Sequence, residues 1–311
     1  MSYLIKNITR INNIKNKKLF KFKSKKISNL FKKISYQDRI QIYDIGAGLR
    51  YLPTLIKFDG ISKIHLIDPN QNIEVSYKNL KKIFLDKRSI HKYKVGLSNK
   101  NEKIFYYPAK VSSGSSFLNL KKKKNNSQYD VDYFGKEKRL LKKVYDFETF
   151  IKKNKLKKPD IIKVDVEGLE FKILSSILKK NRPLIIEVEV NFDNSIIGDT
   201  FLKTHGLIKR KNYNLNTIFP TYQNYNLPFL SERKMFLEGD YNNPLSRNSI
   251  AQSDCYYILN KKKYNIRDLI MLIGYGFIND AKKEYIKIKN EISMTNKKIF
   301  EQLFNSLKNY E

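Results

Sequence analysis

The sequence predicts an α/β fold built on a mostly parallel β-sheet, and two observations support this. From residue 40 onward, apolar runs of strand length alternate with stretches whose apolar residues recur at helical spacing. Strands joined by crossover helices produce this pattern. The run at 40–44 is followed by a glycine turn with Gly46 and Gly48, and the run at 63–68 ends in Asp68. A glycine turn after one strand and an acid after the next are typical of folds that bind a nucleotide.

The first half of the chain is expected to contain four strands and two helices. The strands are expected at 40–44, 63–68, 91–97 and 103–107, and the helices at 49–58 and 72–85. The serine-rich segment at 111–117 is expected either to line the mouth of a ligand site or to be a plain flexible loop. The lysine-rich segment at 121–126 is expected to be a solvated loop.

The second half continues this alternation and then becomes irregular. We expect a helix at 146–155, a strand at 160–165, a helix from Gly168, a strand at 184–190, a further helix, and last strands at 207–210 and 255–259. Residues 213–250 are rich in Asn, Tyr and Pro and lack periodicity. A long irregular segment beside the last strands is expected to be a lid over an acceptor, or else a surface embellishment.

The two ends of the chain are expected to be helical additions to a central domain at 40–260. Residues 1–39 contain twelve Lys and Arg and one acid, with apolar residues at helical spacing. Such a segment either lies on an anionic membrane surface or polymer, or forms helices that pack on the sheet edge with solvated lysines. The second interpretation is favoured. Residues 261–311 are expected to be a helical appendage for packing or self-association.

The composition is strongly basic, with 62 Lys and Arg against 30 Asp and Glu and a formal charge of +32. Such a charge attracts anionic partners such as acidic lipid surfaces, phosphorylated glycan carriers or nucleic acid, although abundant Lys, Asn, Ile and Tyr also indicate a compositional bias. No apolar run approaches the roughly 20 residues that cross a bilayer, and no secretory signal is recognisable. The single cysteine, Cys255, is expected in the core and fits a reducing compartment. A cytoplasmic location, with peripheral membrane attachment as an option, is therefore expected.

The glycine turn favours S-adenosylmethionine over a dinucleotide as the cofactor. A dinucleotide fold places a third glycine where this chain has Tyr51, to seat a helix under the pyrophosphate. S-Adenosylmethionine has no phosphate, so a tight turn between two acids is sufficient. We expect Asp44 to face the methionine ammonium and Asp68 to accept hydrogen bonds from the ribose hydroxyls.

The chain resembles the FkbM family of S-adenosylmethionine-dependent methyltransferases over roughly residues 40–190. The matching stretches are YDIGAG at 43–48, LIDPN at 66–70, VGLS at 95–98, SGSSF at 113–117, KVDVEGLE at 163–170 and LIIEV at 184–188. The resemblance implies a Rossmann-like class I methyltransferase fold, with a seven-stranded sheet and helices on both faces. It also implies O-methylation of a sugar, glycan or other hydroxyl-bearing metabolite. Gly48, Arg50 and Asn99 depart from the usual family pattern; Arg50 either grips the methionine carboxylate or points to solvent.

These arguments define three groups of candidate site residues. The cofactor group is Asp44, Gly46, Ala47, Gly48, Asp68, Pro69, Leu97 and Ser98; the catalytic group is Asp165 and Glu167; the substrate-binding group is Ser115, Ser116, Glu187 and Glu189. Asp165 is the leading candidate for a general base or an orienter of the acceptor hydroxyl. For Glu167 and Glu170 the alternative is to cap the next helix. No metal ligand is assigned, because acids at strand ends commonly cluster without a metal and the three histidines have no ligand spacing.

Two other functions remain open at this stage. An RNA or nucleotide methyltransferase is favoured only by the charge. Ribose-methylating enzymes usually use a lysine among acids, and we expect Lys163 and Asp165 to face opposite sides of the sheet, with Val164 between them, which counts against this function. The other alternative is a methyltransferase-like basic scaffold without activity. The presence of Asp44, Gly46, Gly48, Asp68 and Asp165 argues against it.

Overall fold

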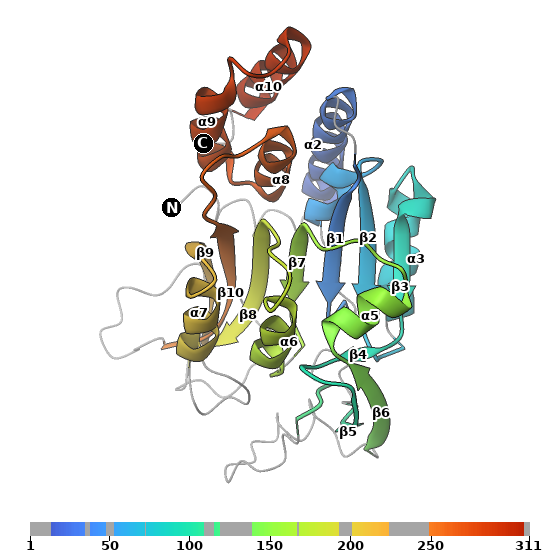
Figure 1. Ribbon diagram of the computed structural model, residues 1–311. Helices are drawn as coiled ribbons and strands as arrows, with labels where there is room; N and C mark the ends of the chain where they lie inside the picture. Colours follow the sequence, from blue (N-terminus) through green and yellow to red (C-terminus); the bar gives the residue numbers. More distant parts are fainter. Residues whose placement is uncertain are drawn as a thin grey trace, which may run out of the picture.

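The computed structural model describes residues 14–34, 38–47, 53–71, 73–108, 115–118, 139–166, 168–192, 201–223 and 249–307. Its centre is a seven-stranded sheet with the order β3-β2-β1-β7-β8-β10-β9 (Figure 1). The strands are β1 (Ile40–Ile45), β2 (Ser62–Ile67), β3 (Ile90–Tyr93), β7 (Ile161–Val164), β8 (Ile185–Asn191), β9 (Tyr213–Gln223) and β10 (Ser249–Leu259). β10 runs antiparallel to both neighbours, whereas the other paired strands are parallel. The predicted fold class is confirmed.

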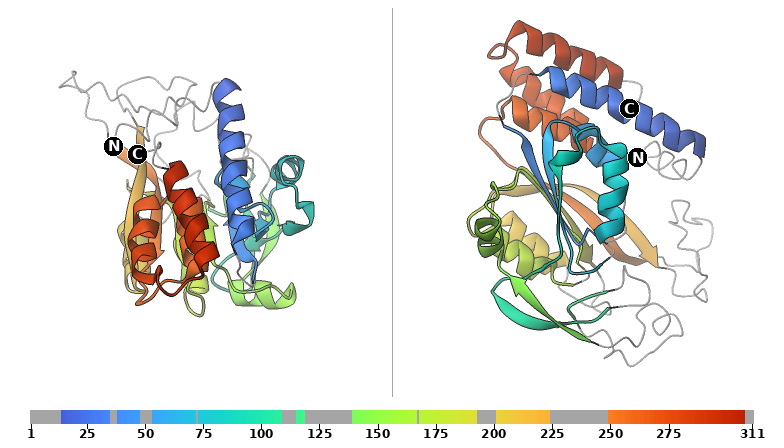
Figure 2. Two further views of the ribbon diagram at one scale, coloured as in Figure 1. Left: turned by 90° about the horizontal axis from the view of Figure 1, so that it is seen from above. Right: turned by 90° about the vertical axis from the view of Figure 1, so that its right-hand side faces the viewer.

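Helices cover both faces of this sheet, and this explains the continuous apolar runs of the central strands. All six residues of β1 are buried, as expected for a parallel strand enclosed by helices on both sides. One face packs against α2 (Ile14–Lys33), the short 3-10 helix η1 (Pro53–Phe58), α3 (Ile73–Ile83) and α8 (Ile266–Tyr275). The other face packs against α5 (Phe147–Lys153), α6 (Glu170–Ile177) and α7 (Phe201–Lys209). The three layers are visible in Figure 2.

A second, three-stranded sheet lies beyond the carboxyl ends of the parallel strands (Figure 1). It consists of β4 (Gly96–Leu97), β5 (Glu102–Tyr106) and β6 (Leu140–Tyr145), in the order β4-β6-β5. The single strand predicted at 91–97 is wrong, because the chain leaves the large sheet after β3 and joins β6 as β4. Gly96 permits this change, since an added Cβ there would lie 2.5 Å from the Phe117 ring. The strand predicted at 103–107 is confirmed as β5.

The last two strands have different bounds from those that the sequence predicts, since β9 begins later and β10 begins earlier. The expected strand at 207–210 is wrong, because 201–209 form α7 and the strand starts at Tyr213, after Asn212 with a φ of 67°. Residues 213–223, expected within an irregular segment, form β9 and pair along β10 with two irregularities in register. Residues 224–248 of the expected lid lie outside the described residues, and its last two residues, 249 and 250, begin β10.

Both ends of the described chain are helical, as expected, and they pack against each other. α9 (Ile278–Ile288), α10 (Met294–Leu307) and α2 lie side by side in both views of Figure 2. α2 is one helix across a face of the sheet rather than a pair at the edge, because Ile27, Phe31 and Ile34 are buried in the core. Residues 1–13 lie outside the described residues. Among the helices described here, none is long and apolar enough to cross a membrane.

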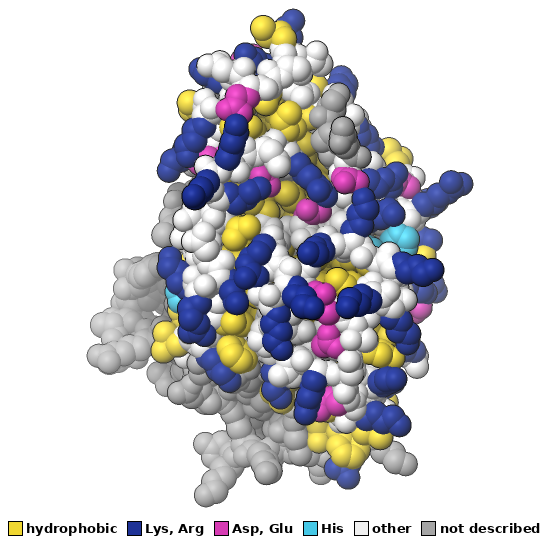
Figure 3. All heavy atoms as spheres, viewed as in Figure 1, with side chains coloured by type: hydrophobic (Ala, Val, Ile, Leu, Met, Phe, Trp, Pro, Cys, Tyr) yellow, Lys and Arg dark blue, Asp and Glu magenta, His cyan; other side chains and the backbone are white. Residues whose placement is uncertain are grey.

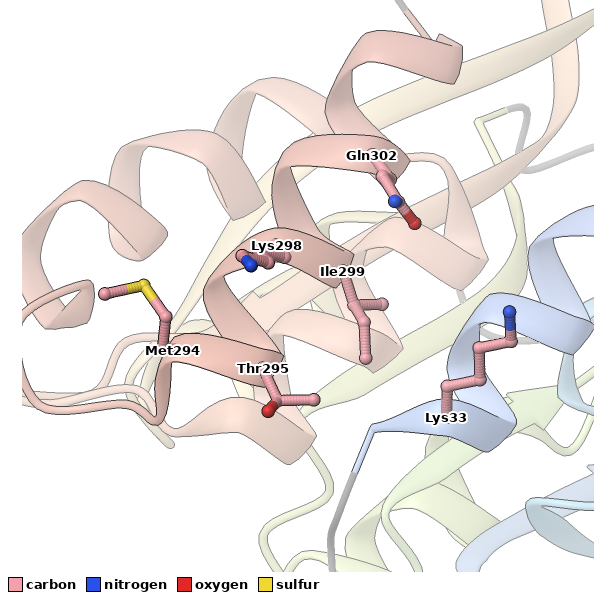
Figure 4. Close-up of a pocket in the computed structure, with 6 residues that line it drawn as sticks. All are labelled: Lys33, Met294, Thr295, Lys298, Ile299 and Gln302. Atoms are coloured by element: carbon pink, nitrogen blue, oxygen red, sulfur yellow. The ribbon is translucent and has the colours of Figure 1, made fainter.

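A hollow of about 340 Å³ lies between α2 and α10. Its lining residues are Lys33, Met294, Thr295, Lys298, Ile299 and Gln302 (Figure 4). The C-terminal end of α2 lies beside the start of β1 (Figure 1), so the hollow is at the amino ends of the parallel strands. In open α/β sheets ligands bind at the opposite, carboxyl ends. The hollow is therefore separate from the predicted site.

Candidate active site

The glycine turn after β1 brings the ends of β1, β2 and β7 together. Gly46 has a φ of 86°, a conformation that favours glycine, and its N–H donates to the Ile67 carbonyl at 2.8 Å. A Cβ added to Gly46 would lie 1.7 Å from the carbonyl oxygen of Asp165, so no other residue fits without moving the backbone. Ala47 is buried beside it. Gly48, the next predicted cofactor residue, lies outside the described residues.

Asp68, the predicted ribose-binding acid, follows β2 directly. It is nearly buried, and its Oδ1 accepts a hydrogen bond from the Asn70 N–H at 2.6 Å. Burial raises the pKa of Asp68 to about 7; the Asn70 N–H opposes this rise, and the Asp44 and Asp165 charges add to it. The Asp44 and Asp165 carboxyls therefore lie close enough to Asp68 to raise its pKa, at the carboxyl ends of β1, β2 and β7. Pro69 follows, partly exposed.

A row of polar side chains crosses the middle of the sheet on the face covered by α8. Strand pairing places Asp44 of β1 opposite Lys163 of β7, Lys163 opposite Glu187 of β8, and Glu187 opposite Tyr256 of β10. Side chains paired in this way project from the same face of a sheet. Asp165 continues the row toward the carboxyl end of β7.

Lys163 and Asp165 form a buried ion pair, with 2.7 Å between Lys163 Nζ and Asp165 Oδ2. The expectation that these side chains face opposite sides was wrong, because residues two apart on a strand share a face. Burial alone would lower the pKa of Lys163, but the Asp165 and Glu187 carboxyls, with Asp44 and Asp254 behind them, raise it. Lys163 is therefore a fixed ammonium and the counter-ion of the row.

Glu187 is the most enclosed acid of the predicted substrate-binding group. Burial raises its pKa to about 7, against the attraction of Lys163 and with further increases from Asp254, Asp44 and Asp165. Glu189, two residues further along β8, is partly exposed and stands opposite Asp254 of β10. The two glutamates share one face, as predicted. Whether they contact an acceptor stays a prediction.

The two other glutamates of the strand-end segment have different outcomes. Glu170 accepts hydrogen bonds from the Val166 N–H at 3.1 Å and from the Gly168 N–H at 2.9 Å. Its carboxylate therefore organises the turn between β7 and α6, which is the capping role considered above. Glu167, the second predicted catalytic residue, lies outside the described residues.

The predicted residues after β4 and in the serine-rich segment divide into two groups. Leu97 is buried in the core, and the Ser98 N–H donates to the Tyr145 carbonyl at 2.9 Å. Contact with β6 therefore fixes the backbone at Leu97 and Ser98. Ser115 approaches the cofactor side, with its Oγ 3.4 Å from Asn70 Nδ2. Ser116 is buried and its Oγ accepts a hydrogen bond from the Leu118 N–H at 2.9 Å. Its hydroxyl therefore stabilises the conformation of its own segment.

Sequence reasoning did not assign Lys163, Asp254, Tyr256 or Tyr275 to the site. A lysine inside the apolar run IIKVD was a visible sign, because a buried strand tolerates an ammonium only when it is paired. Asp254, Tyr256 and Tyr275 lie in later parts of the chain that no motif covers. Within the residues that the structure describes, no group of three or more His, Cys, Asp or Glu side chains is placed to hold a metal ion.

These residues fit S-adenosylmethionine. Gly46 has no side chain, so the turn after β1 packs directly against the backbone of Asp165 and brings the ends of β1 and β7 to one corner. Asp44 is the last but one residue of β1 and Asp68 follows β2, so two acids lie at the carboxyl ends of neighbouring strands, as an ammonium and a ribose would require. The carboxylates Asp44, Asp68 and Asp165 also match the net positive charge of a sulfonium cofactor.

Comparisons with known proteins identify the family. The sequence model described as the methyltransferase FkbM domain matches residues 44–215, which is more than half of the chain. No curated protein sequence matches the chain significantly. The family assignment therefore depends on the domain match.

Several solved structures are similar, all at low identity. An FkbM methyltransferase from Methylobacillus flagellatus KT has 14% identity and a TM-score of 0.37, with 75% of this chain and 47% of that chain covered. A putative O-methyltransferase from Klebsiella pneumoniae has 9% identity, a TM-score of 0.37, and coverage of 78% and 80%. A precorrin-6y C5,15-methyltransferase from Geobacter metallireducens GS-15 has 11% identity, a TM-score of 0.36, and coverage of 75% and 86%.

The domain match begins at Asp44, and the glycine turn, Asp68 and Asp165 all lie within its range. The chain belongs to the FkbM family of methyltransferases and uses S-adenosylmethionine as its cofactor.

Proposed function

We propose that the protein transfers a methyl group to a hydroxyl of a sugar, glycan or related metabolite. The observation that carries this proposal is the position of Asp165, which follows β7 against the glycine turn and is held by Lys163. A carboxylate fixed in this way is suited to orient a hydroxyl, because its position does not depend on the acceptor. The acceptor class itself is taken from the family resemblance.

Different residues have different roles in this reaction. Bound S-adenosylmethionine supplies an activated methyl group on its sulfonium sulfur. Asp68 accepts hydrogen bonds from the ribose, and Asp44 faces the ammonium. Asp165 accepts a hydrogen bond from the acceptor hydroxyl and takes its proton as the new C–O bond forms, a contribution of about 10²–10⁴-fold for a positioned base. We assign Glu187, Glu189 and Ser115 to other hydroxyls of the acceptor.

Methylation of RNA or nucleotides is the alternative, and the electrostatics of the site argue against it. The reason given above, that Lys163 and Asp165 face apart, does not apply, since the two are paired. However, the raised pKa of Lys163 keeps it protonated, and a protonated lysine cannot remove a proton. The acids around it would also repel phosphates. A basic scaffold without activity is the second alternative.

The test is transfer of a radiolabelled methyl group from S-adenosylmethionine to a panel of neutral sugars, amino sugars, sugar phosphates and RNA. We expect labelled product with a sugar, and loss of about 10²–10⁴-fold of the rate in Asp165→Asn, with S-adenosylhomocysteine affinity retained. Labelling of RNA alone would replace the proposal with its alternative. Cofactor binding without labelling of any acceptor would favour the scaffold.

A further inference from the structure

The strands β5 and β6 form a ribbon whose two faces differ in character. Side chains alternate between the faces of a strand, and the face with Tyr106 and Val144 is buried. Phe117 packs on that face, with 5.1 Å between its ring centroid and that of Tyr106. The other face points outward. We call it the ribbon face, and its residues are Lys103 and Phe105 of β5, Leu141, Lys143 and Tyr145 of β6, and Arg139 before β6.

Large apolar side chains are exposed on the ribbon face and beside it. Phe105 and Leu141 stand opposite each other on the two strands and are 41% and 56% exposed. Leu140, the first residue of β6, is 42% exposed. At this lower end of the molecule, Figure 3 shows hydrophobic side chains at the surface with Lys and Arg side chains next to them. Apolar side chains gathered at the surface favour contact with an apolar partner.

Cations surround the apolar pair. Lys103 and Lys143 stand directly opposite each other on the two strands, and like charges in this position weaken strand pairing. The guanidinium carbon of Arg139 lies 4.2 Å from the ring centroid of Phe105. Among the residues that the structure describes, these three cations form no ion pair with an acid. An anionic partner would therefore relieve a repulsion within the ribbon face.

A fourth cation extends this charge toward the active site. Lys153 of α5 donates a hydrogen bond to the Tyr145 hydroxyl at 3.1 Å, and its Nζ lies 4.9 Å from the centroid of that ring. The Lys143 Nζ lies 5.2 Å from the same centroid, so two ammonium groups gather at one ring. The Tyr145 carbonyl accepts from the N–H of Ser98, a predicted cofactor residue. The ribbon face is therefore fixed next to the cofactor site.

The combination of cations with exposed aliphatic side chains favours a lipid surface over nucleic acid. Basic side chains attract anionic headgroups, and Phe and Leu side chains insert at the boundary between headgroups and acyl chains. Single-stranded nucleic acid is bound instead by aromatic rings on which its bases stack. On the ribbon face, cations already lie over the rings of Phe105 and Tyr145, and Leu140 and Leu141 provide no ring.

We propose that the ribbon face docks the protein on a membrane surface that carries anionic lipids. Its cations contact the headgroups, and Phe105 and Leu141 insert beneath them. Because the ribbon lies beyond the carboxyl ends of the parallel strands (Figure 1), docking holds the active site close to the lipid surface. This proposal does not depend on the class of acceptor, so failure of the sugar panel leaves it intact.

The test is sedimentation of the full chain with vesicles of phosphatidylcholine, alone or mixed with phosphatidylglycerol, at low and at high salt. We expect binding to the mixed vesicles only. Leu141→Ser should weaken this binding about three- to tenfold, because it removes an apolar group from the lipid. The double substitution Lys103→Gln and Lys143→Gln should weaken it about 10- to 30-fold at low salt. At high salt this loss should be smaller, because charges are screened.

Matched variants elsewhere on the surface make the result specific. Leu202→Ser removes a leucine of α7 that is more exposed than Leu141. The double substitution Lys179→Gln and Lys180→Gln removes the same charge from two exposed lysines after α6. Both variants should bind the mixed vesicles nearly as well as wild type does. Binding of S-adenosylhomocysteine by each variant confirms that it is folded.

Three results would overturn the proposal. Equal losses in the two double variants would mean that binding follows the net charge and not the ribbon face. Unchanged vesicle binding in Leu141→Ser would mean that the ribbon face does not enter the lipid. Titration with a single-stranded RNA of mixed sequence tests the other partner. If the Lys103 and Lys143 double variant lost RNA binding but kept vesicle binding, the ribbon face would be assigned to nucleic acid.

Discussion

Two lysine–aspartate ion pairs in this protein have the same N···O distance but opposite environments, one buried and one exposed. Lys163 and Asp165 are 2.7 Å apart with side chains 4% and 5% exposed, whereas Lys157 and Asp38 are also 2.7 Å apart but 64% and 59% exposed. Solvent screens the exposed pair, which contributes about 0–1 kcal/mol. Inside the sheet each charge depends on its partner, so removal of one leaves the other unpaired. The distance between the charged atoms therefore does not by itself indicate how much an ion pair contributes to stability.

The same contrast separates the surface from the site. Lys and Arg side chains are spread over the face that carries α5, α6 and α7, with few acids among them (Figure 3). The polar row within the fold is acidic, with Asp44, Asp165 and Glu187 around Lys163. The net charge of +32 therefore describes long-range attraction to anionic partners. It does not describe the chemistry at the strand ends.

The largest difference between the two pairs is expected in stability. Lys163→Met should lower the free energy of unfolding by about 3–5 kcal/mol, because it leaves buried carboxylates without their counter-ion. Lys157→Met should change it by less than about 1 kcal/mol. Urea denaturation of both variants measures this contrast. Equal losses in the two variants would mean that burial does not separate the pairs.

A somewhat smaller effect is expected from pH. The carboxyls of Asp68 and Glu187 have pKa values raised to about 7, mainly by burial. Between their unfolded pKa values and about pH 7 these carboxyls bind more protons in the folded state, so the stabilisation that they contribute is greatest at low pH and falls as the pH rises. Each carboxyl contributes up to about 1.4 kcal/mol per pH unit in this range. Unfolding of wild type and Glu187→Gln measured from pH 5 to pH 8 isolates this contribution, and the stability of wild type relative to the variant should fall as the pH rises.

The affinity for the cofactor should change with pH in the opposite direction and increase as the pH rises toward 7. Asp68 must be ionised to accept hydrogen bonds from both ribose hydroxyls, so affinity for S-adenosylhomocysteine should fall up to about tenfold per pH unit below pH 7. Calorimetric titration at pH 6, 7 and 8 measures this. Asp68→Asn should bind weakly, and its affinity should vary much less with pH. A wild-type affinity that rises on acidification would exclude Asp68 from ribose recognition.

The smallest effect is expected at the N-terminus. We propose that Lys6 and Arg10 in the first 13 residues help to attract anionic surfaces. Binding to vesicles with acidic lipids should be weak and should decrease further between about 0.1 and 1 M salt, as the screening length shortens from 10 to 3 Å. Removal of residues 1–13 is the appropriate variant. Deletion of 1–39 would also remove Ile27, Phe31 and Ile34 from the core. Unchanged vesicle binding in the shorter deletion would refute surface attachment through that segment.

Local patterns were sufficient for the parts of the site that one chain segment builds. The glycine turn and the acids at 44 and 68 were found by spacing, because a buried strand that ends in a tight turn leaves few alternatives. Strand boundaries were less predictable. The segment at 91–97 reads as one strand, but it divides between two sheets because Gly96 approaches Phe117 and Val144, a contact between distant residues. β6 was missed, since its surroundings are polar and most of its residues are not buried.

The sequence by itself determined the fold class, the family and the cofactor, since these depend on short motifs and on the alternation of strands and helices. Only the tertiary structure decided how the charges combine. Lys163 belongs with Asp165 and Glu187 because neighbouring parallel strands place them in one row. Tyr256 stands opposite Glu187 although 69 positions separate their numbers in the chain. The energies of such contacts depend on burial and on partners brought together by folding, which no local pattern encodes.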